Sequence, residues 1–254
     1  MNRKKLMTYL IWSFGLTWIC DGMIIASHYL HLELDILRDI LNALGAIAPA
    51  VAACIVLKKY NITEERKPIW RFIFDFPKRI WAYVILFGFM FWRFLVFYLN
   101  RDIAGSDSAY MLFLWLIVML LFGGGFEEPG WRGFLQPYFE KKYPFTISIL
   151  CVSTIWAVWH IPLWFIPGSA QNEMNFILFF FQLFVNACSL AAILKLTKSV
   201  VLCMIYHAWG NAVFVVILIE LNIGIIIAYA LEAVIALVIC YVYDKRNREK
   251  AFTQ

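Results

Sequence analysis

Long apolar segments, separated by short polar connections, follow one another along the whole chain. Runs of 18 or more apolar residues are long enough to cross the hydrocarbon core of a bilayer as helices. The pattern therefore predicts an all-α, polytopic membrane protein, with residues 1–254 forming a single integral membrane domain. We expect about eight transmembrane helices, at 6–27, 40–57, 79–98, 110–126 (or on to 139), 144–166, 174–194, 199–219 and 222–243.

Composition agrees with this pattern. Hydrophobic residues make up 63% of the chain, charged residues only 15%, and the mean hydropathy is +0.75. A soluble domain of this length needs far less apolar surface. The first apolar stretch contains Asp21 and lacks a small-residue cleavage pattern, so it is expected to be a transmembrane helix and not a removable signal peptide. The six cysteines fall in apolar segments without CxxC spacing, which argues against disulfides and zinc fingers.

The basic residues are distributed unevenly between the two sides of the predicted membrane. Of the 22 Lys and Arg residues, all except Arg38, Arg93 and Arg101 fall at the termini or in connections on one side. The positive-inside rule then places both termini in the cytoplasm, which agrees with an even number of spans. This distribution also explains the net charge of +5 without nucleic acid as a partner. We expect a multi-pass protein of the cell membrane, with the lipid bilayer as its surroundings.

Two adjacent carboxylates, Glu127 and Glu128, stand at the end of the fourth apolar run, after three glycines and before Arg132. Charges inside hydrocarbon cost about 2.5 to 3.5 kcal/mol each on insertion scales, so the cluster requires an explanation. Neighbouring helical residues point about 100° apart. Glu128 can pair with Arg132 at i and i+4, which leaves Glu127 free for chemistry. The alternative is that both glutamates mark the solvated end of a short helix.

A second polar residue, His160, is expected at the same depth as Glu127. If the fourth helix continues to about Glu140 and the chain turns back there, Glu127 and His160 lie roughly 23 and 26 Å above the turn, on antiparallel helices. Ile161-Pro162 follows, so the histidine helix is expected to kink or end near this site. Taken alone, a histidine on an apolar helix is more often a core residue than a catalytic one.

His207 and Asn211 are also four residues apart and share one face of the seventh predicted helix. Two such side chains in hydrocarbon can hold helices together by hydrogen bonds, or they can form a donor pair for a developing oxyanion. Three other charged residues in apolar segments each stand alone in the sequence, and we expect them to serve structural pairing or to line a cavity. These are Asp21, Arg93 and Glu232.

Several protease chemistries are excluded by the motifs that the chain lacks. There is no HExxH zinc motif, no GxSG serine motif within a helix and no GxGD aspartyl motif. The remaining candidates for catalysis are the glutamates at 127 and 128, the histidines at 160 and 207, and Asn211.

These residues resemble those of the CPBP (CAAX protease and bacteriocin-processing) family, which includes the type II CAAX prenyl endopeptidases. The family's EExxxR motif matches residues 127–132, its aromatic-xxx-His motif matches 156–160 with Trp in place of the common Phe, and its Hxxx(N/D) motif matches 207–211. The three occur in the family's order on adjacent predicted helices. The motif-bearing catalytic core would cover about 123–215.

The resemblance implies an intramembrane endopeptidase that hydrolyses a peptide bond of a membrane-associated protein or peptide. Glu127 would be the general base on a water molecule that His160 helps to orient. His207 and Asn211 would stabilise the oxyanion. Supporting roles, which hold the helix geometry, would fall to Glu128 and Arg132.

Two alternatives stay open at this point. Members of the family have also been described as metal-dependent, and a divalent metal such as zinc would be held by Glu127, His160 and His207. We favour water activation by glutamate without a required cofactor. The second alternative is a non-proteolytic membrane scaffold or bacteriocin self-immunity protein, although a scaffold has no need of an unpaired carboxylate within the membrane.

Overall fold

The computed structural model is built from α-helices and short 3₁₀ or π-helical turns, and describes residues 3–32, 35–61, 73–101, 110–217, 219 and 222–252. Seven helical spans are long and apolar enough to cross a membrane, and Val200–Val216 is a shorter apolar helix. The prediction of an all-α, multi-pass membrane protein is therefore confirmed. The helices are α1 (Arg3–Tyr29), α2 (Asp35–Lys59), α4 (Ile80–Leu99), α5 (Met111–Phe122), α6 (Glu128–Gly130), α7 (Gln136–Glu140), α8 (Phe145–Trp159), α9 (Phe176–Thr197), α10 (Val200–Val216) and α11 (Ile223–Phe252).

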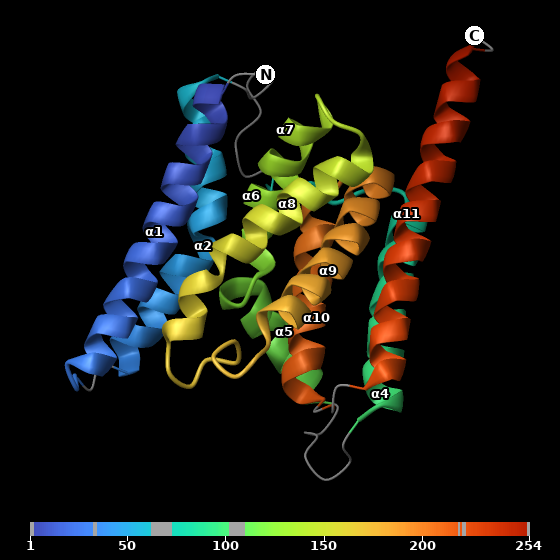
Figure 1. Cartoon of the computed structure of the whole chain (residues 1–254). Coiled ribbons are helices and arrows are strands. Elements are labelled where there is room, and N and C mark those ends of the chain that lie inside the picture. The colour runs from blue at the N-terminus through green and yellow to red at the C-terminus, as the bar shows by residue number, and fades with distance from the viewer. Residues whose placement is uncertain are drawn as a thin grey trace.

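The helices form three groups side by side (Figure 1). The antiparallel pair α1 and α2 lies on one flank, α4 and α11 lie on the other, and the segment from α5 to α10 fills the space between them. The N-terminal end of α1 and the C-terminal end of α11 lie on the same side of the molecule (Figure 1). This placement agrees with an even number of crossings, while the cytoplasmic position of the termini stays a prediction.

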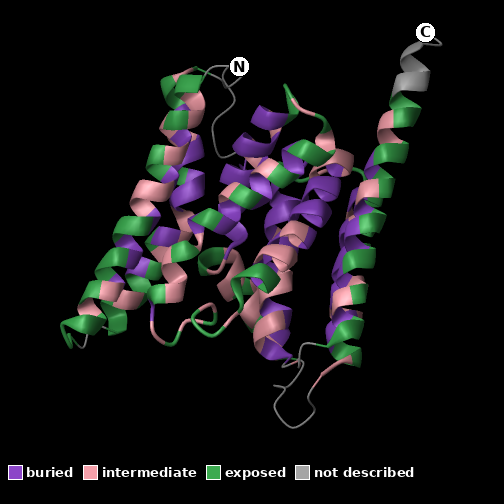
Figure 2. Cartoon of the chain, viewed as in Figure 1, coloured by how far each residue is buried: buried purple, intermediate pink, exposed green. Residues whose placement is uncertain are grey.

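Burial follows this arrangement (Figure 2). Helices α9 and α10 are buried along much of their length, whereas α1 and α11 expose large apolar side chains on their outer faces, such as Ile19 and Val234. The buried face of α9 is rich in small residues, including Ala187, Ser189 and Ala191. Small side chains let backbones approach closely, which strengthens packing where lipid removes the hydrophobic force between helices.

The fourth membrane segment is broken near its middle. Helix α5 ends at Phe122, and Gly124 takes a φ of +111°, a conformation that a side chain would strain. A 3₁₀ turn (Gly125–Glu127), the short α6 and a π-helical turn (Trp131–Leu135) follow before α7. An added Cβ on Gly130 would lie 2.5 Å from the Pro49 carbonyl oxygen, so this glycine allows α6 to pack directly on the backbone of α2.

Arg93 and Glu232 form a structural pair, one of the two roles expected for them from the sequence, although the sequence did not indicate that they are each other's partner. Arg93 Nη2 lies 2.7 Å from Glu232 Oε1, and Arg93 Nε donates to Oε2 at 3.2 Å. The Tyr206 and Ser189 hydroxyls also donate to Oε1, each at 2.6 Å. All four side chains are almost completely buried. The group therefore joins α4, α9, α10 and α11 through hydrogen bonds to one carboxylate.

Removing one member of this ion pair should destabilise the protein more than removing both. We expect Glu232→Leu to lower the stability by about 3 to 5 kcal/mol, because the Arg93 charge is left buried without a counterion. The double variant Arg93→Leu, Glu232→Leu should be less destabilised than the single variant. Thermal unfolding of detergent-solubilised protein, followed by the monodisperse fraction on size exclusion, measures both. A double variant less stable than the single one would contradict this account.

Candidate active site

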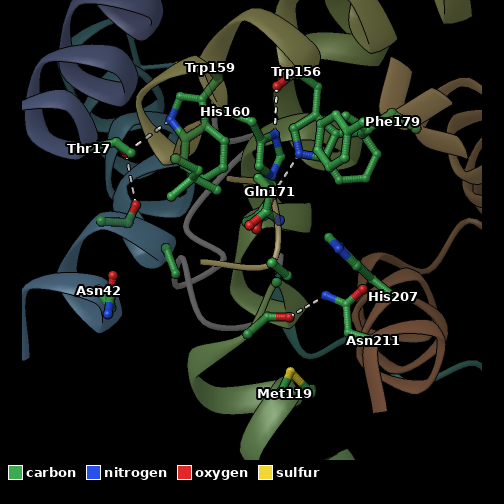
Figure 3. Close-up of a pocket in the computed structure, with 18 of the residues that line it drawn as sticks. Thr17, Asn42, Met119, Trp156, Trp159, His160, Gln171, Phe179, His207 and Asn211 are labelled. Atoms are coloured by element: carbon green, nitrogen blue, oxygen red, sulfur yellow. Dashed lines mark hydrogen bonds between the residues drawn. The ribbon is translucent and has the colours of Figure 1, made fainter. Parts of the chain in front are cut away.

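A cavity of about 320 Å³ lies between the α1–α2 pair and the helices α8, α9 and α10 (Figure 3). All four residues predicted to be catalytic line it, together with polar residues from α1 and α2. Glu127 comes from the broken fourth segment, His160 from the end of α8, and the other two from α10. The antiparallel hairpin of the fourth and fifth segments therefore brings Glu127 and His160 into one cavity. The predicted catalytic residues are Glu127, His160, His207 and Asn211.

The Glu127 carboxylate is held by two tryptophans. Its Oε2 accepts hydrogen bonds from Trp131 Nε1 at 3.0 Å and from Trp156 Nε1 at 2.7 Å. The residue is only 6% exposed, which rules out the solvated helix end considered above. Oε1 has no hydrogen-bond partner among the described residues. One oxygen is thus fixed in place while the other remains available in the cavity.

Trp131 was missed by the sequence reasoning, although a signal for it exists. It lies four residues after Glu127, a spacing that brings two side chains together on one helical face. Trp156, the aromatic residue of the predicted motif, lies beside His160, with the two ring centroids 5.9 Å apart. Its hydrogen bond to Glu127 joins residues 29 positions apart and could not be inferred from local spacing.

Glu128 has a different set of partners from its neighbour. Its Oε2 lies 3.1 Å from Arg132 Nε, an ion pair with both side chains fully buried, as the i and i+4 spacing predicted. This contact is an ion pair without hydrogen-bond geometry. Its Oε1 is 2.8 Å from His207 Nδ1, a contact that the sequence did not indicate. The Arg132 side chain continues the chain of polar contacts to Gln136 Oε1, at 3.3 Å.

His160 is oriented by the end of its own helix. Helix α8 ends at Trp159, and a 3₁₀ turn (Ile161–Phe165) follows, which confirms the predicted break before Pro162. His160 Nδ1 lies 2.8 Å from the Trp156 carbonyl oxygen. Because a carbonyl only accepts, Nδ1 carries the hydrogen, and in the neutral ring Nε2 is the acceptor. Trp159 and Phe179 contact the ring edge-to-face, with centroids 4.7 and 5.1 Å away.

His207 and Asn211 converge beside Gly124. An ideal Cβ on Gly124 would lie 2.6 Å from His207 Nε2 and 2.9 Å from Asn211 Nδ2, so both nitrogens point at the space that a side chain would occupy. Asn211 Nδ2 also donates to the Gly123 carbonyl at 2.6 Å. An amide nitrogen has two hydrogens, so one of them remains for another acceptor.

The donor set for a metal was tested against this geometry. Among the residues that the structure describes, no group of three His, Cys, Asp or Glu side chains is close enough to hold a metal ion. The three residues predicted for the metal-dependent alternative, Glu127, His160 and His207, line one cavity without forming such a group. The arrangement of the described residues therefore does not match a three-ligand metal site.

The fold and the cavity define a multi-pass integral membrane protein with a buried Glu/His site. The family model described as "Type II CAAX prenyl endopeptidase Rce1-like" matches residues 109–213, a stretch that contains all three motifs. The chain is also 25% identical over 220 residues to CAAX prenyl protease 2 of Methanococcus maripaludis, covering 79% of this chain and 77% of that protein. The predicted resemblance to CAAX prenyl endopeptidases is confirmed, and it supports a peptidase, a hydrolase.

Gly124 should be indispensable to the site. Gly124→Ala would place a methyl group against His207 Nε2 and strain the left-handed backbone, so we expect at least a tenfold loss of peptidase activity. Gly88→Ala is the matched control, because its Cβ would meet no atom within 4 Å. Peptide cleavage per folded protein, measured for both variants at equal membrane abundance, checks this. Equal activity of the two variants would mean that the space beside Gly124 is not used.

Proposed function

We propose that the protein is an intramembrane endopeptidase in which Glu127 activates a water molecule to hydrolyse a peptide bond of a membrane-associated protein or peptide. The observation that carries this proposal is the half-engaged Glu127 carboxylate, which is buried in the same cavity as His160, His207 and Asn211. A carboxylate with one fixed and one available oxygen suits a general base, since it can accept a proton in a defined direction.

The water is activated between Glu127 Oε1 and His160 Nε2. Glu127 takes one proton from the water while His160, with its hydrogen on Nδ1, accepts the other hydrogen bond through Nε2. The resulting hydroxide attacks the carbonyl carbon of the scissile bond. Glu127 then gives the proton to the departing nitrogen. The products are a carboxylic acid and an amine, between which a proton passes to give a carboxylate and an ammonium group, and the Glu127 carboxylate is restored.

The tetrahedral oxyanion is stabilised by the donors beside Gly124. Asn211 Nδ2 supplies the hydrogen that is not directed at Gly123. His207 Nε2 can donate only when the ring carries both protons, and the Glu128 carboxylate at Nδ1 favours that cationic form. Positively charged and amide donors aimed at developing charge in a dry site are usually the largest contribution to such catalysis.

The two indole donors to Glu127 have a positioning role. They hold Oε2 by N–H groups that carry no net charge, which fixes the carboxylate without neutralising it by a nearby cation. Arg132 lies close by, but its charge is directed at Glu128. The base at Glu127 and the ion pair at Glu128 are therefore separated although the two residues are adjacent.

The substrate lies in or at the membrane, because the cavity is built from membrane-spanning helices. The similar archaeal protein is named as a CAAX prenyl protease. A C-terminally prenylated peptide is therefore the first probe to use, with the same peptide lacking the prenyl group beside it. Cleavage of both would mean that a membrane-associated peptide is sufficient and that the prenyl group is not required.

The proposal is tested by removing the base and its histidine. Glu127→Gln and His160→Ala should each lower the cleavage rate by about 10² to 10⁴-fold, the range for loss of a general base or of its orientation. Glu173→Gln makes the same chemical change at an exposed glutamate outside the cavity and should retain activity. Rates are measured in proteoliposomes at equal protein abundance. If both site variants remain as active as the parent, the peptidase proposal fails, and the scaffold or immunity role gains support.

A chelation experiment separates the two proposed chemistries. We expect activity to survive dialysis against a strong divalent chelator, because the described residues offer no three-ligand cluster. Cleavage is measured before and after dialysis and after addition of zinc, with bound metal determined by mass spectrometry. Loss of activity that zinc restores would show that a metal is required and would overturn water activation by Glu127 alone.

A further inference from the structure

We propose that Asp21 forms a subsite that binds a cationic side chain of the substrate, so that the enzyme prefers a basic residue near the cleaved bond. This inference rests on the proposed peptidase function and extends it to specificity. Asp21 lies on α1 and lines the same cavity as the predicted catalytic residues. It is a specificity-determining residue in this account and takes no part in the bond-breaking step.

Asp21 is buried without a partner for its charge. The residue is only 3% exposed, and its Oδ2 has no hydrogen-bond partner among the described residues. An ionisable residue inside the membrane is unfavourable unless it is paired, and such residues typically line functional pathways. Asp21 lines the cavity and makes no hydrogen bond or ion pair with the described residues, so its carboxylate is left for a donor that arrives with the substrate.

The other buried carboxylates in the described part of the chain all have hydrogen-bond or ion-pair partners. Glu232 meets Arg93 and two hydroxyls, Glu128 meets Arg132 and His207, and Glu127 accepts from two indoles. Each of these contacts explains why the charge is tolerated. No equivalent contact is present at Asp21, so a purely structural role does not account for it.

The Thr17 hydroxyl, on the same helix as Asp21, is already hydrogen-bonded to other partners. Thr17, one turn before Asp21, donates to the Gly45 carbonyl at 2.9 Å and accepts from Trp159 Nε1 at 3.0 Å. Figure 3 shows Thr17 and Asn42 on the opposite side of the cavity from His207 and Asn211. The α1–α2 wall thus carries a polar surface that faces the proposed oxyanion donors across the cavity.

The charge of the cavity favours a cationic occupant. Two carboxylates, Asp21 and Glu127, line it, none of its described lining residues is Lys or Arg, and the charge of the cationic His207 in the proposed mechanism is balanced by Glu128. Arg132 and Arg38 are engaged with other groups: Arg132 faces Glu128, and Arg38 donates to the Pro167 carbonyl. Complementary charge selects partners and excludes those of the wrong sign. Lysine or arginine in the substrate would supply the positive partner that Asp21 lacks among the described residues.

The experiment compares matched peptides in proteoliposomes. Each position flanking the bond that the parent protein cleaves is occupied by Lys or by norleucine, which keeps the aliphatic stem and removes the charge. We expect the parent to prefer Lys by about 10- to 100-fold in kcat/KM at one position, the effect of a hydrogen bond between charged groups. Asp21→Asn should reduce this ratio to near 1, and Asp21→Glu should preserve the preference. The ratio of two rates on one sample is insensitive to the fraction of folded protein.

Asp39→Asn is the matched control, since it removes the same charge from an exposed position on α2. It should leave the ratio unchanged. If the parent cleaves the peptides without a preference for Lys at any position, or if Asp21→Asn keeps the preference, the subsite is wrong while the peptidase function stands. If the parent cleaves none of the peptides, prenylated or not, the proposed function fails and the subsite fails with it.

Discussion

Glu128, which has no exposed surface, connects the irregular fourth segment, which carries Glu127, to helix α10, which carries His207 and Asn211. One of its oxygens meets Arg132 in the same irregular segment, and the other meets His207 on α10. A buried carboxylate with either partner missing is strongly unfavourable, so the three groups hold one another in place. Because His207 and Asn211 share a helical face, fixing the histidine also fixes the amide. The separation of roles between the two adjacent glutamates depends on this contact.

The sequence predicts most of the fold because hydrophobic length is a strong signal in membrane proteins. Among the described residues, seven of the eight predicted segments correspond to helices long enough to span a membrane and the eighth, 199–219, to the shorter helix α10, while the Glu128–Arg132 pair follows from its spacing of four residues. Glu127 and His160 were expected at similar depths in the membrane, and they line one cavity. They stand at similar distances along the chain from the turn that joins two antiparallel segments. The rise per residue of a helix was therefore enough to predict that the two residues come together.

What the sequence could not predict are the contacts between distant segments. Glu128 and His207 are 79 residues apart, and Arg93 and Glu232 are 139 apart. Periodicity gives the face of a helix but not the neighbour that the face meets. A pairing role was expected for Arg93 and Glu232, but for this reason the sequence did not show that they pair with each other. The convergence of His207 and Asn211 beside Gly124 depends on a left-handed glycine whose conformation no local pattern specifies.

The π-helical turn at Trp131–Leu135 affects how the part of the fourth segment before it is rotated relative to the part after it. Such a turn accommodates one residue more than a regular α-helical turn does. Were it to relax to α-helix, everything before it would rotate against everything after it by about 100°, the angle between neighbouring residues. That angle is also the separation of Glu127 from Glu128. The π-helical turn thus sets the rotation of the fourth segment about its axis, with Glu127 toward the cavity and Glu128 toward Arg132.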